Sequence, residues 1–312
     1  MAWNSTEQFD VLGLGCTAVD DLFYIEGYPA ADGKVQIRGD DRQCGGLTAT
    51  ALVAAARMGA RCAYAGSLGD DELSRFVERR LRQEGISLDY VHRQAESRPV
   101  HSVIVVDEAH HTRTIFYDPR RAGRASPDWP PEELILASKV LFVDPYGIAG
   151  MLRAARVARA AGIPVVADVE NPRAGEQLAE LVELVDHLVV PLDFAQAWTG
   201  RQRAGEAAEA LWNDRRKAVV VTCGADGCWY LGGKETRGLL HQPAYRVDVV
   251  DTTGCGDVFH GAYAAGSAEG LPLAERVRLA SAAAALKAGR RGGQTGIPTR
   301  EAVETFLKER SE

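Results

Sequence analysis

The 312-residue sequence lacks the segments that would place a protein in a membrane or export it. No apolar run approaches the roughly 18 residues that a membrane-spanning helix needs. The first ten residues have neither a basic head nor an apolar stretch, so a secretory signal is not expected. We therefore expect a cytoplasmic protein with no membrane partner.

Cysteine is also scarce. Six cysteines are spread along the chain, and no two of them form a Cys-x-x-Cys pair. This density is far below that of a disulfide-stapled fold, and Cys223 and Cys228 lack a second cluster that would complete a zinc site. We expect reduced thiols throughout, with Cys223 and Cys228 serving as packing residues.

Basic residues are outnumbered, with 36 Lys and Arg against 43 Asp and Glu and a net charge of −7. This balance argues against general nucleic-acid binding and gives no attraction to anionic membranes. The phosphate-binding pattern Gly-x-x-x-x-Gly-Lys-[Ser/Thr] is absent, which excludes that class of nucleotide site. Positive potential for an anionic substrate must therefore be concentrated locally.

Glycine, in contrast, is abundant, and regular alternation fills the second half of the chain. Short apolar runs at 140–144, 165–168, 188–190 and 218–222 are separated by helical patterns. Such alternation predicts a mostly parallel sheet with helices on both faces. Alanine stripes at 149–161 and 276–290 predict close helix packing on that sheet, and a helical tail over 257–308 is interrupted near 292–293 and Pro298.

The first half of the chain has a different pattern. A buried strand at 9–15, a strand at 62–66 and helices at 48–58 and 71–83 continue the α/β pattern. The β-like stretches 22–27 and 35–41, and a hairpin formed by 100–106 and 112–117, have no helices between their halves. We predict one α/β domain over 1–312, with a small inserted β-sheet lid at about 21–42 and 100–117.

The most informative segment is Val250–Ala262, which contains Asp-Thr-Thr-Gly-Cys-Gly-Asp. Glycines flank a small residue immediately before an apolar helical run. Such a turn directs backbone N–H groups at one point, at the positive end of a helix dipole, and forms an anion site. Asp257 falls in the first helical turn, where it can act as a general base. A bare glycine turn before an Asp is usually only a helix cap, but the full string is far more specific.

This string resembles the second signature of the ribokinase (PfkB) family of carbohydrate kinases. Three other segments agree in order: Gly45-Gly46 before an Ala-rich helix, the turn at 220–227, and the glycine-rich loop at 292–298. The resemblance covers essentially the whole chain. It implies a ribokinase-like, doubly wound α/β fold with a β lid, and transfer of the γ-phosphoryl of ATP to a sugar hydroxyl.

The resemblance also implies roles for single residues. Asp257 would be the base, and the N–H groups of Gly254, Cys255 and Gly256 the anion hole, with Cys255 in place of the usual Ala. Asp20 would bind sugar hydroxyls, and Gly45 and Gly46 would let the sugar approach the backbone. Asp251 and Thr253 fall where some members hold a monovalent cation such as K⁺. The nucleotide side would comprise Thr222, Gly224, Gly227 and Gly293.

Three departures from the family pattern concern magnesium and substrate. The family's Asn-x-x-Glu becomes Leu-Asp-Phe-Ala, which leaves Asp193 to reach Mg²⁺ through water. Thr50 stands where an Asn usually contacts the sugar. Much of the chain is similar to the sulfofructose kinase branch, with Lys34 shared, yet Tyr117 and Tyr146 occupy the positions of that branch's sulfonate-binding Asn and Arg. The basic stretch at 120–124 suggests that Lys34 and Arg120, or a neighbouring arginine, hold the distal end of the substrate.

Other interpretations remain open at this stage. Gly13–Ala18 fits a dinucleotide fingerprint, but the following residues are β-like where a helix is required. His110-His111 resembles a metal pair, although a solvated hairpin turn is favoured. A nucleoside kinase would use lid aromatics such as Phe23, Tyr24, Tyr28 and Tyr117, and a non-catalytic sugar sensor would explain the missing Asn-x-x-Glu.

The sequence therefore predicts an ATP- and Mg²⁺-dependent kinase acting on a primary hydroxyl of a small sugar. A fructose-like ketose or a derivative is the favoured substrate. Because exposed lid strands need covering, we also expect a homodimer that pairs through the lid.

Overall fold

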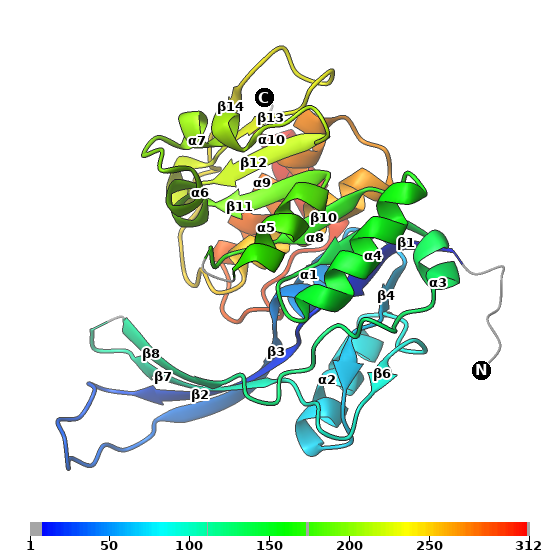
Figure 1. The fold of residues 1–312 in the computed structure, drawn as a ribbon. Coiled ribbons are helices and arrows are strands. Elements are labelled where there is room, and N and C mark those ends of the chain that lie inside the picture. Colours follow the sequence, from blue (N-terminus) through cyan, green and yellow to red (C-terminus); the bar gives the residue numbers. More distant parts are fainter. Residues whose placement is uncertain (1–7, 111, 173–174, 311–312) are drawn as a thin grey trace.

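The computed structural model describes residues 8–110, 112–172 and 175–310. Its central sheet has eight strands in the order β14-β13-β12-β11-β10-β9-β1-β4 (Figure 1). The six strands from β12 to β4 are parallel, and β13 and β14 are antiparallel. The strands are β1 Phe9–Leu14, β4 Cys62–Tyr64, β9 Ser138–Val143, β10 Val165–Asp168, β11 His187–Pro191, β12 Ala218–Thr222, β13 Cys228–Leu231 and β14 Leu240–Gln242.

Helices cover both faces of this sheet because successive strand residues point to opposite sides. On one face Val140 and Phe142 pack with α1, α8, α9 and α10; on the other Leu141 and Val143 pack with α3 to α7. The first set comprises α1 Leu47–Arg57, α8 Cys255–Ala268, α9 Leu273–Ala288 and α10 Arg300–Glu309. The second comprises α3 Glu132–Leu136, α4 Ile148–Ala160, α5 Glu176–Leu184, α6 Leu192–Thr199 and α7 Ala204–Leu211.

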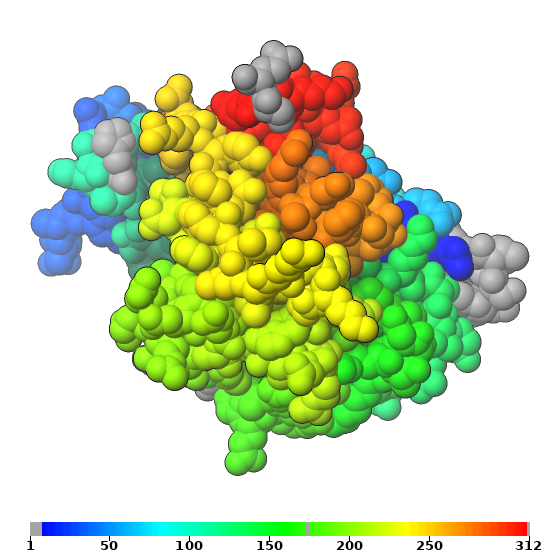
Figure 2. All heavy atoms as spheres, turned by 90° about the horizontal axis from the view of Figure 1, so that it is seen from above, coloured from blue at the N-terminus to red at the C-terminus, as the bar shows by residue number. Residues whose placement is uncertain are grey.

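A separate four-stranded sheet forms the lid, in the order β3-β2-β7-β8. Its strands are β2 Ala18–Ile25, β3 Gly39–Gly45, β7 Val100–Asp107 and β8 Thr112–Asp118. Along the chain, the segment between β3 and β7 also contains α2 Glu72–Gln83 and a two-stranded sheet of β5 Ser67–Leu68 and β6 His92–Arg93. The lid projects beyond the α/β domain in two orthogonal views (Figures 1 and 2).

Two boundaries differ from the sequence prediction. The strand expected at 35–41 is found at Gly39–Gly45, because its residues pair with β2 from Tyr24 back to Ala18 while the residues before Gly39 form an exposed loop. The helical tail has an additional break between α8 and α9, where Gly270 adopts a positive φ of 77° and Pro272 begins the next helix as its N-cap. The lid hairpin and the strands at 165–168 and 218–222 are confirmed.

Register assigns each lid side chain to one of two faces. Asp20 pairs with Gln43 on β3 and with Ser102 on β7, and Ser102 pairs with Tyr117 on β8. These four residues therefore form one row across the lid. The Gln43 side chain accepts from the Gly293 N–H at 3.0 Å, so this row lies on the face toward the α/β domain.

Candidate active site

The glycine turn before α8 is held in place from two directions. One carboxylate oxygen of Asp251 accepts from the Thr253 N–H at 2.8 Å, and the other accepts from the Gly292 N–H at 2.9 Å. Gly254 is the helix N-cap with φ 76°. The first N–H groups of an α-helix have no partner within it, so the turn presents donors at the positive end of α8.

Of the three N–H groups predicted to form the anion hole, that of Cys255 has a partner within the turn. The Cys255 N–H donates to the Thr252 carbonyl at 3.2 Å. The structure therefore leaves Gly254 and Gly256 as the stronger candidates for anion donors. The Cys255 thiol lies partly buried beside them, and burial raises its pKa.

Asp257 follows in the first turn of α8, as the sequence predicted. Its carboxyl group lies beside Asp168, at the carboxyl end of β10. Burial raises the pKa of Asp257 well above its usual range, and repulsion from Asp168 and Glu170 raises it further. A carboxyl group with a raised pKa is suited to accept a proton near neutral pH. Its side chain retains partial exposure, so a substrate can reach it.

The lid row places Asp20 opposite this turn. Burial raises the pKa of Asp20, while a hydrogen bond from Ser102 opposes the shift. A Cβ atom on Gly45 would lie 2.7 Å from a carboxylate oxygen of Asp20, and one on Gly46 would lie 2.6 Å from the Thr17 Cα atom. The glycine pair therefore leaves space for the Asp20 carboxylate and for close backbone packing.

Three further predicted sugar contacts lie in this region. The buried Thr50 hydroxyl accepts from the Gln294 side chain at 3.3 Å, and its methyl group lies beside Gly254. Tyr146 is partly buried, and burial raises its pKa to about 12 with a contribution from nearby Tyr117. The two tyrosines are thus neighbours although they come from the lid and from the loop after β9.

The two predicted distal cations are less well placed. Lys34 is exposed in the loop between β2 and β3. Arg120 is exposed and forms a bidentate pair with Asp118 at 2.8 Å. Their role in substrate binding stays a prediction. His110 binds Asp107 in the hairpin, while His111 lies outside the described residues.

A cavity of 670 Å³ opens beside the glycine turn. Thr222, Gly224 and Gly227 line it, together with Cys255 and Gly256, so five predicted residues meet there. Sequence reasoning missed its largely apolar wall, which includes Ala244, Tyr245, Val247, Phe259, Ala284, Ala285 and Ala288. Such walls are typical of ligand pockets.

The role of Gly293 in nucleotide binding stays a prediction. This residue is not among the lining residues of that cavity. Its N–H donates instead to the side chain of Gln43 on the lid, and its carbonyl oxygen lies opposite Gly254. Gly293 therefore connects the C-terminal glycine loop to the lid.

Of the residues predicted to bind cations, Asp251 and Thr253 have protein neighbours that the sequence did not reveal. The fully buried Lys287 donates to the Asp251 carbonyl oxygen at 2.7 Å, and its ammonium lies 3.9 Å from an Asp251 carboxylate oxygen. The Thr253 hydroxyl accepts from Arg113 of the lid. Asp193 is exposed in the first turn of α6. Within the described ranges, no three His, Cys, Asp or Glu side chains converge as a metal cage.

Sequence reasoning also missed four buried groups around the site. Asp144 accepts from the Cys16 N–H, the Thr48 hydroxyl and the Tyr146 N–H at 2.7–2.8 Å, and so ties together three segments of the site. Asp168, His260 and Lys287 surround the glycine turn from β10, α8 and α9. His260 lies three residues after Asp257 in the same helix, a spacing that could have suggested a shared helix face.

Comparison with known proteins decides what this arrangement belongs to. A family model described as "pfkB family carbohydrate kinase" matches residues 16–300. The chain is a member of the pfkB family of carbohydrate kinases. This pfkB kinase is 28% identical to fructokinase-2 of Solanum habrochaites over 290 residues, which cover 85% of this chain and 87% of that one. It is thus a phosphotransferase that acts on the hydroxyl group of a sugar or nucleoside.

Solved structures agree on the fold of this pfkB kinase. A crystal structure from Agrobacterium tumefaciens, provisionally named a ribokinase, has 31% identity and a TM-score of 0.88, with 97% of this chain and 98% of that one covered. The ribokinase of Arabidopsis thaliana complexed with ribose and ATP has 23% identity and a TM-score of 0.82, with 97% and 99% covered. The ribokinase-like fold predicted from the sequence is confirmed, and none of the described helices is long and apolar enough to cross a membrane.

Proposed function

We propose that this chain transfers the γ-phosphoryl group of ATP to a primary hydroxyl of a small sugar, with a fructose-like ketose or a derivative favoured. The observation that carries the proposal is the position of Asp257. Its carboxyl group stands in the first turn of α8, directly after Cys255 and Gly256, which line the 670 Å³ cavity.

The chemistry follows from this placement. The sugar hydroxyl gives its proton to Asp257 while its oxygen forms a bond to the γ-phosphorus, and the bond from that phosphorus to the β–γ bridging oxygen breaks to release ADP. N–H groups of Gly254 and Gly256 stabilise the negative charge on the transferred group. The lid covers the sugar and excludes water, which limits ATP hydrolysis.

Metal ions enter the proposal in two ways. Mg²⁺ commonly binds through phosphates, waters and one or two carboxylates rather than an all-protein cage. The exposed Asp193 fits such a water-mediated contact, and Mg²⁺ would neutralise phosphate charge there. The sequence predicts a monovalent cation such as K⁺ at Asp251 and Thr253. We propose that the buried ammonium of Lys287 supplies the positive charge there instead.

The outer face of the lid supports the proposal of a homodimer. Phe23, Val103, Val105 and Phe116 alternate with the substrate-facing row and belong to this face, and Phe116 is 54% exposed. Covering such a face by a second lid would remove the apolar surface from water. Sedimentation of the Phe116→Asp variant tests this pairing, since a monomer is then expected.

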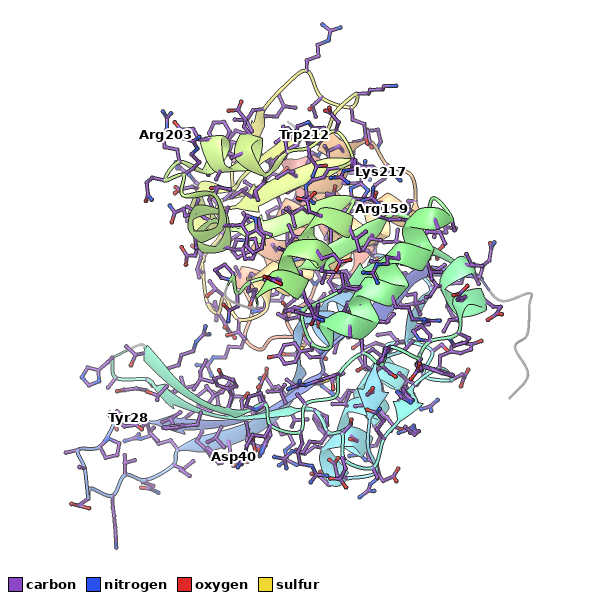
Figure 3. All side chains as sticks on the ribbon, in the orientation of Figure 1. Tyr28, Asp40, Arg159, Arg203, Trp212 and Lys217 are labelled. Atoms are coloured by element: carbon purple, nitrogen blue, oxygen red, sulfur yellow. The ribbon has the colours of Figure 1, made fainter. Side chains whose placement is uncertain are left out.

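The nucleoside-kinase alternative has less support from the lid. Tyr28 lies toward the far end of the lid, away from the α/β domain (Figure 3), and Phe23 belongs to the outer face. Tyr24 lies against Arg291, 5.7 Å from the guanidinium to the ring centroid. Tyr117 and Tyr24 therefore remain on the face of the lid toward the α/β domain, where Tyr117 acts electrostatically on Tyr146 and Asp251 acts on Tyr24.

The test is a screen of ATP consumption over ketoses, aldoses, nucleosides and sugar acids, followed by Asp257→Asn with the best substrate. The variant should lose several orders of magnitude in kcat and keep its affinity for ATP. Asp214→Asn, an exposed carboxyl group far along the chain, is the matched control and should be unchanged. Near-normal turnover by Asp257→Asn would refute the assigned base, and no stimulation by any compound would favour a sugar sensor.

A further inference from the structure

A buried histidine lies one helical turn beyond Asp257 and takes no part in the chemistry described so far. The ring of His260 is 3% exposed and packs edge-on against Phe142, with ring centroids 6.3 Å apart. Its Nδ1 atom lies 2.8 Å from the Gly256 carbonyl oxygen, and its Nε2 atom lies 2.9 Å from the Val189 carbonyl oxygen. A carbonyl oxygen only accepts hydrogen bonds. Both contacts are satisfied together only when both ring nitrogens carry a proton.

The countercharge for such a ring is present. A carboxylate oxygen of Asp168 lies 3.3 Å from Nδ1 of His260, and the Asp168 side chain is 1% exposed. Neither oxygen of Asp168 has a hydrogen-bond donor among the described residues. Because a buried carboxylate without a donor or countercharge is costly, Asp168 needs either the positive ring or a proton shared with Asp257.

The surrounding charges favour a positive ring. Asp144 after β9 and Glu170 after β10 both act electrostatically on Asp168, and Glu170 also acts on Asp257. The groups that face this cluster from the other elements are the Cys16 thiol after β1, the Cys255 thiol at the start of α8 and the Lys287 ammonium on α9. Among the described residues, four carboxyl groups thus lie near a single lysine ammonium and the His260 ring, and the His260 ring is the group in contact with Asp168.

We propose that His260 is a positioning residue that donates from both ring nitrogens, and that its charge lets Asp168 and Asp257 share a single proton, leaving one carboxylate free to act as the base. The proposal rests on Asp257 as the proposed base. When the shared proton lies on Asp168, the Asp257 carboxylate is free to take the proton of the sugar hydroxyl. The two carboxyl groups and the imidazolium then sum to zero charge, the least costly state for a buried cluster.

Loss of the positive ring should change the pKa of Asp257 in one direction. A neighbouring cation favours the ionised form of a carboxyl group, so its removal raises the pKa of Asp257 further. The acidic limb of the kcat–pH profile should therefore move to higher pH. For a shift of about one unit, kcat on that limb falls about tenfold at fixed pH and recovers at higher pH.

His260→Asn is the main variant, because the amide can still donate to one carbonyl but carries no charge. His187→Asn is the matched control: His187 is also buried and contacts the same helix, through the Tyr263 hydroxyl at 3.0 Å. Burial and the nearby Arg276 keep the pKa of His187 well below its usual range, so that ring is neutral. Both variants should lose stability, but only His260→Asn should shift the pH profile.

Two further measurements decide the matter. Asp168→Asn in the His260→Asn background removes the unbalanced charge, and the added amide can donate to Asp257, so the acidic limb should move back. Nitrogen-15 NMR of histidine-labelled apo protein should show two protonated ring nitrogens for His260 and one for His187. An unprotonated nitrogen in the His260 ring would overturn the proposal whatever the reaction is, and so would an unshifted profile for a folded His260→Asn variant. Near-normal turnover by Asp257→Asn would instead refute the proposed base.

Discussion

Gly46→Ala tests how closely the lid strands are fixed to the sugar site. Gly46 is the N-cap of α1 with φ 96°, and Gly59 lies just beyond the other end of the same helix with φ 95°. A Cβ atom on Gly59 meets nothing within 4 Å, whereas one on Gly46 would lie 2.6 Å from the Thr17 Cα atom and 2.7 Å from the Ala18 nitrogen. The two substitutions therefore share a positive φ, and Gly46→Ala differs in the clash and in its ψ of 141°, which lies outside the left-handed helical region.

The magnitudes follow from this difference. Placing alanine in left-handed backbone costs about 1–2 kcal/mol, which is the whole expected loss for Gly59→Ala. Gly46→Ala adds an overpacking cost of about 1–3 kcal/mol, because backbone atoms cannot rotate away as a side chain can, and its ψ of 141° makes its backbone strain at least as large as that of Gly59→Ala. Since Thr17 and Ala18 lead directly into the strand that carries Asp20, the clash should also raise the KM for the sugar.

Urea unfolding and steady-state kinetics check both parts. Gly46→Ala should have the lower unfolding midpoint of the two variants and a raised KM for the sugar, with the KM for ATP little changed. Gly59→Ala should keep wild-type kinetics. If the two variants lose the same stability and both keep the wild-type sugar KM, the inferred contact between the glycine pair and the start of β2 is refuted.

Three other predictions concern the cation, the lid and the nucleotide cavity. Wild-type activity should be the same in KCl and NaCl at equal ionic strength, while Lys287→Met should lose at least tenfold in kcat and regain part of it with K⁺; potassium activation of the wild type would contradict this role for Lys287. Arg113→Ala removes the contact of the lid with Thr253 and should increase ATP hydrolysis in the absence of sugar, measured as ADP release, whereas Arg38→Ala at the exposed loop should not. Ala285→Leu narrows the cavity wall and should raise the KM for ATP severalfold at unchanged sugar KM, and equal effects on both constants would argue against this cavity as the nucleotide site.

The fold could be predicted because its signals are local. The parallel strands at 165–168 and 218–222 are short apolar runs between amphipathic helices, and their bounds match the structure. The lid strand predicted at 35–41 lies four residues further along the chain, because Val35 and Ile37 look β-like although they precede the strand. Its true residues, Gly39–Gly45, are mostly polar and become a strand only through pairing with β2. Propensity does not report such tertiary pairing.

The site residues also differ in whether their signals are local in the sequence. The glycine turn and Asp257 form one contiguous string, so they could be found without a structure. The string does not include Asp168 on β10 or Lys287 on α9, and it ends three residues before His260. Each of these residues looks like an ordinary strand or helix residue. Their roles depend on burial and on which carbonyl or carboxyl group each one faces, and these features arise only when β10, α8 and α9 are packed together.

The direct junction of β3 with α1 has a consequence for the reaction cycle. Gly45 ends a lid strand, and Leu47 begins a helix that packs against α8, so only Gly46 separates the moving sheet from the fixed framework. Asp20 lies on the neighbouring lid strand, so if the lid opens about Gly46, the proposed sugar ligand is withdrawn in the same movement. Product release and lid opening would then be one step. A substitution that stabilises the closed lid should increase the affinity for the sugar and lower kcat.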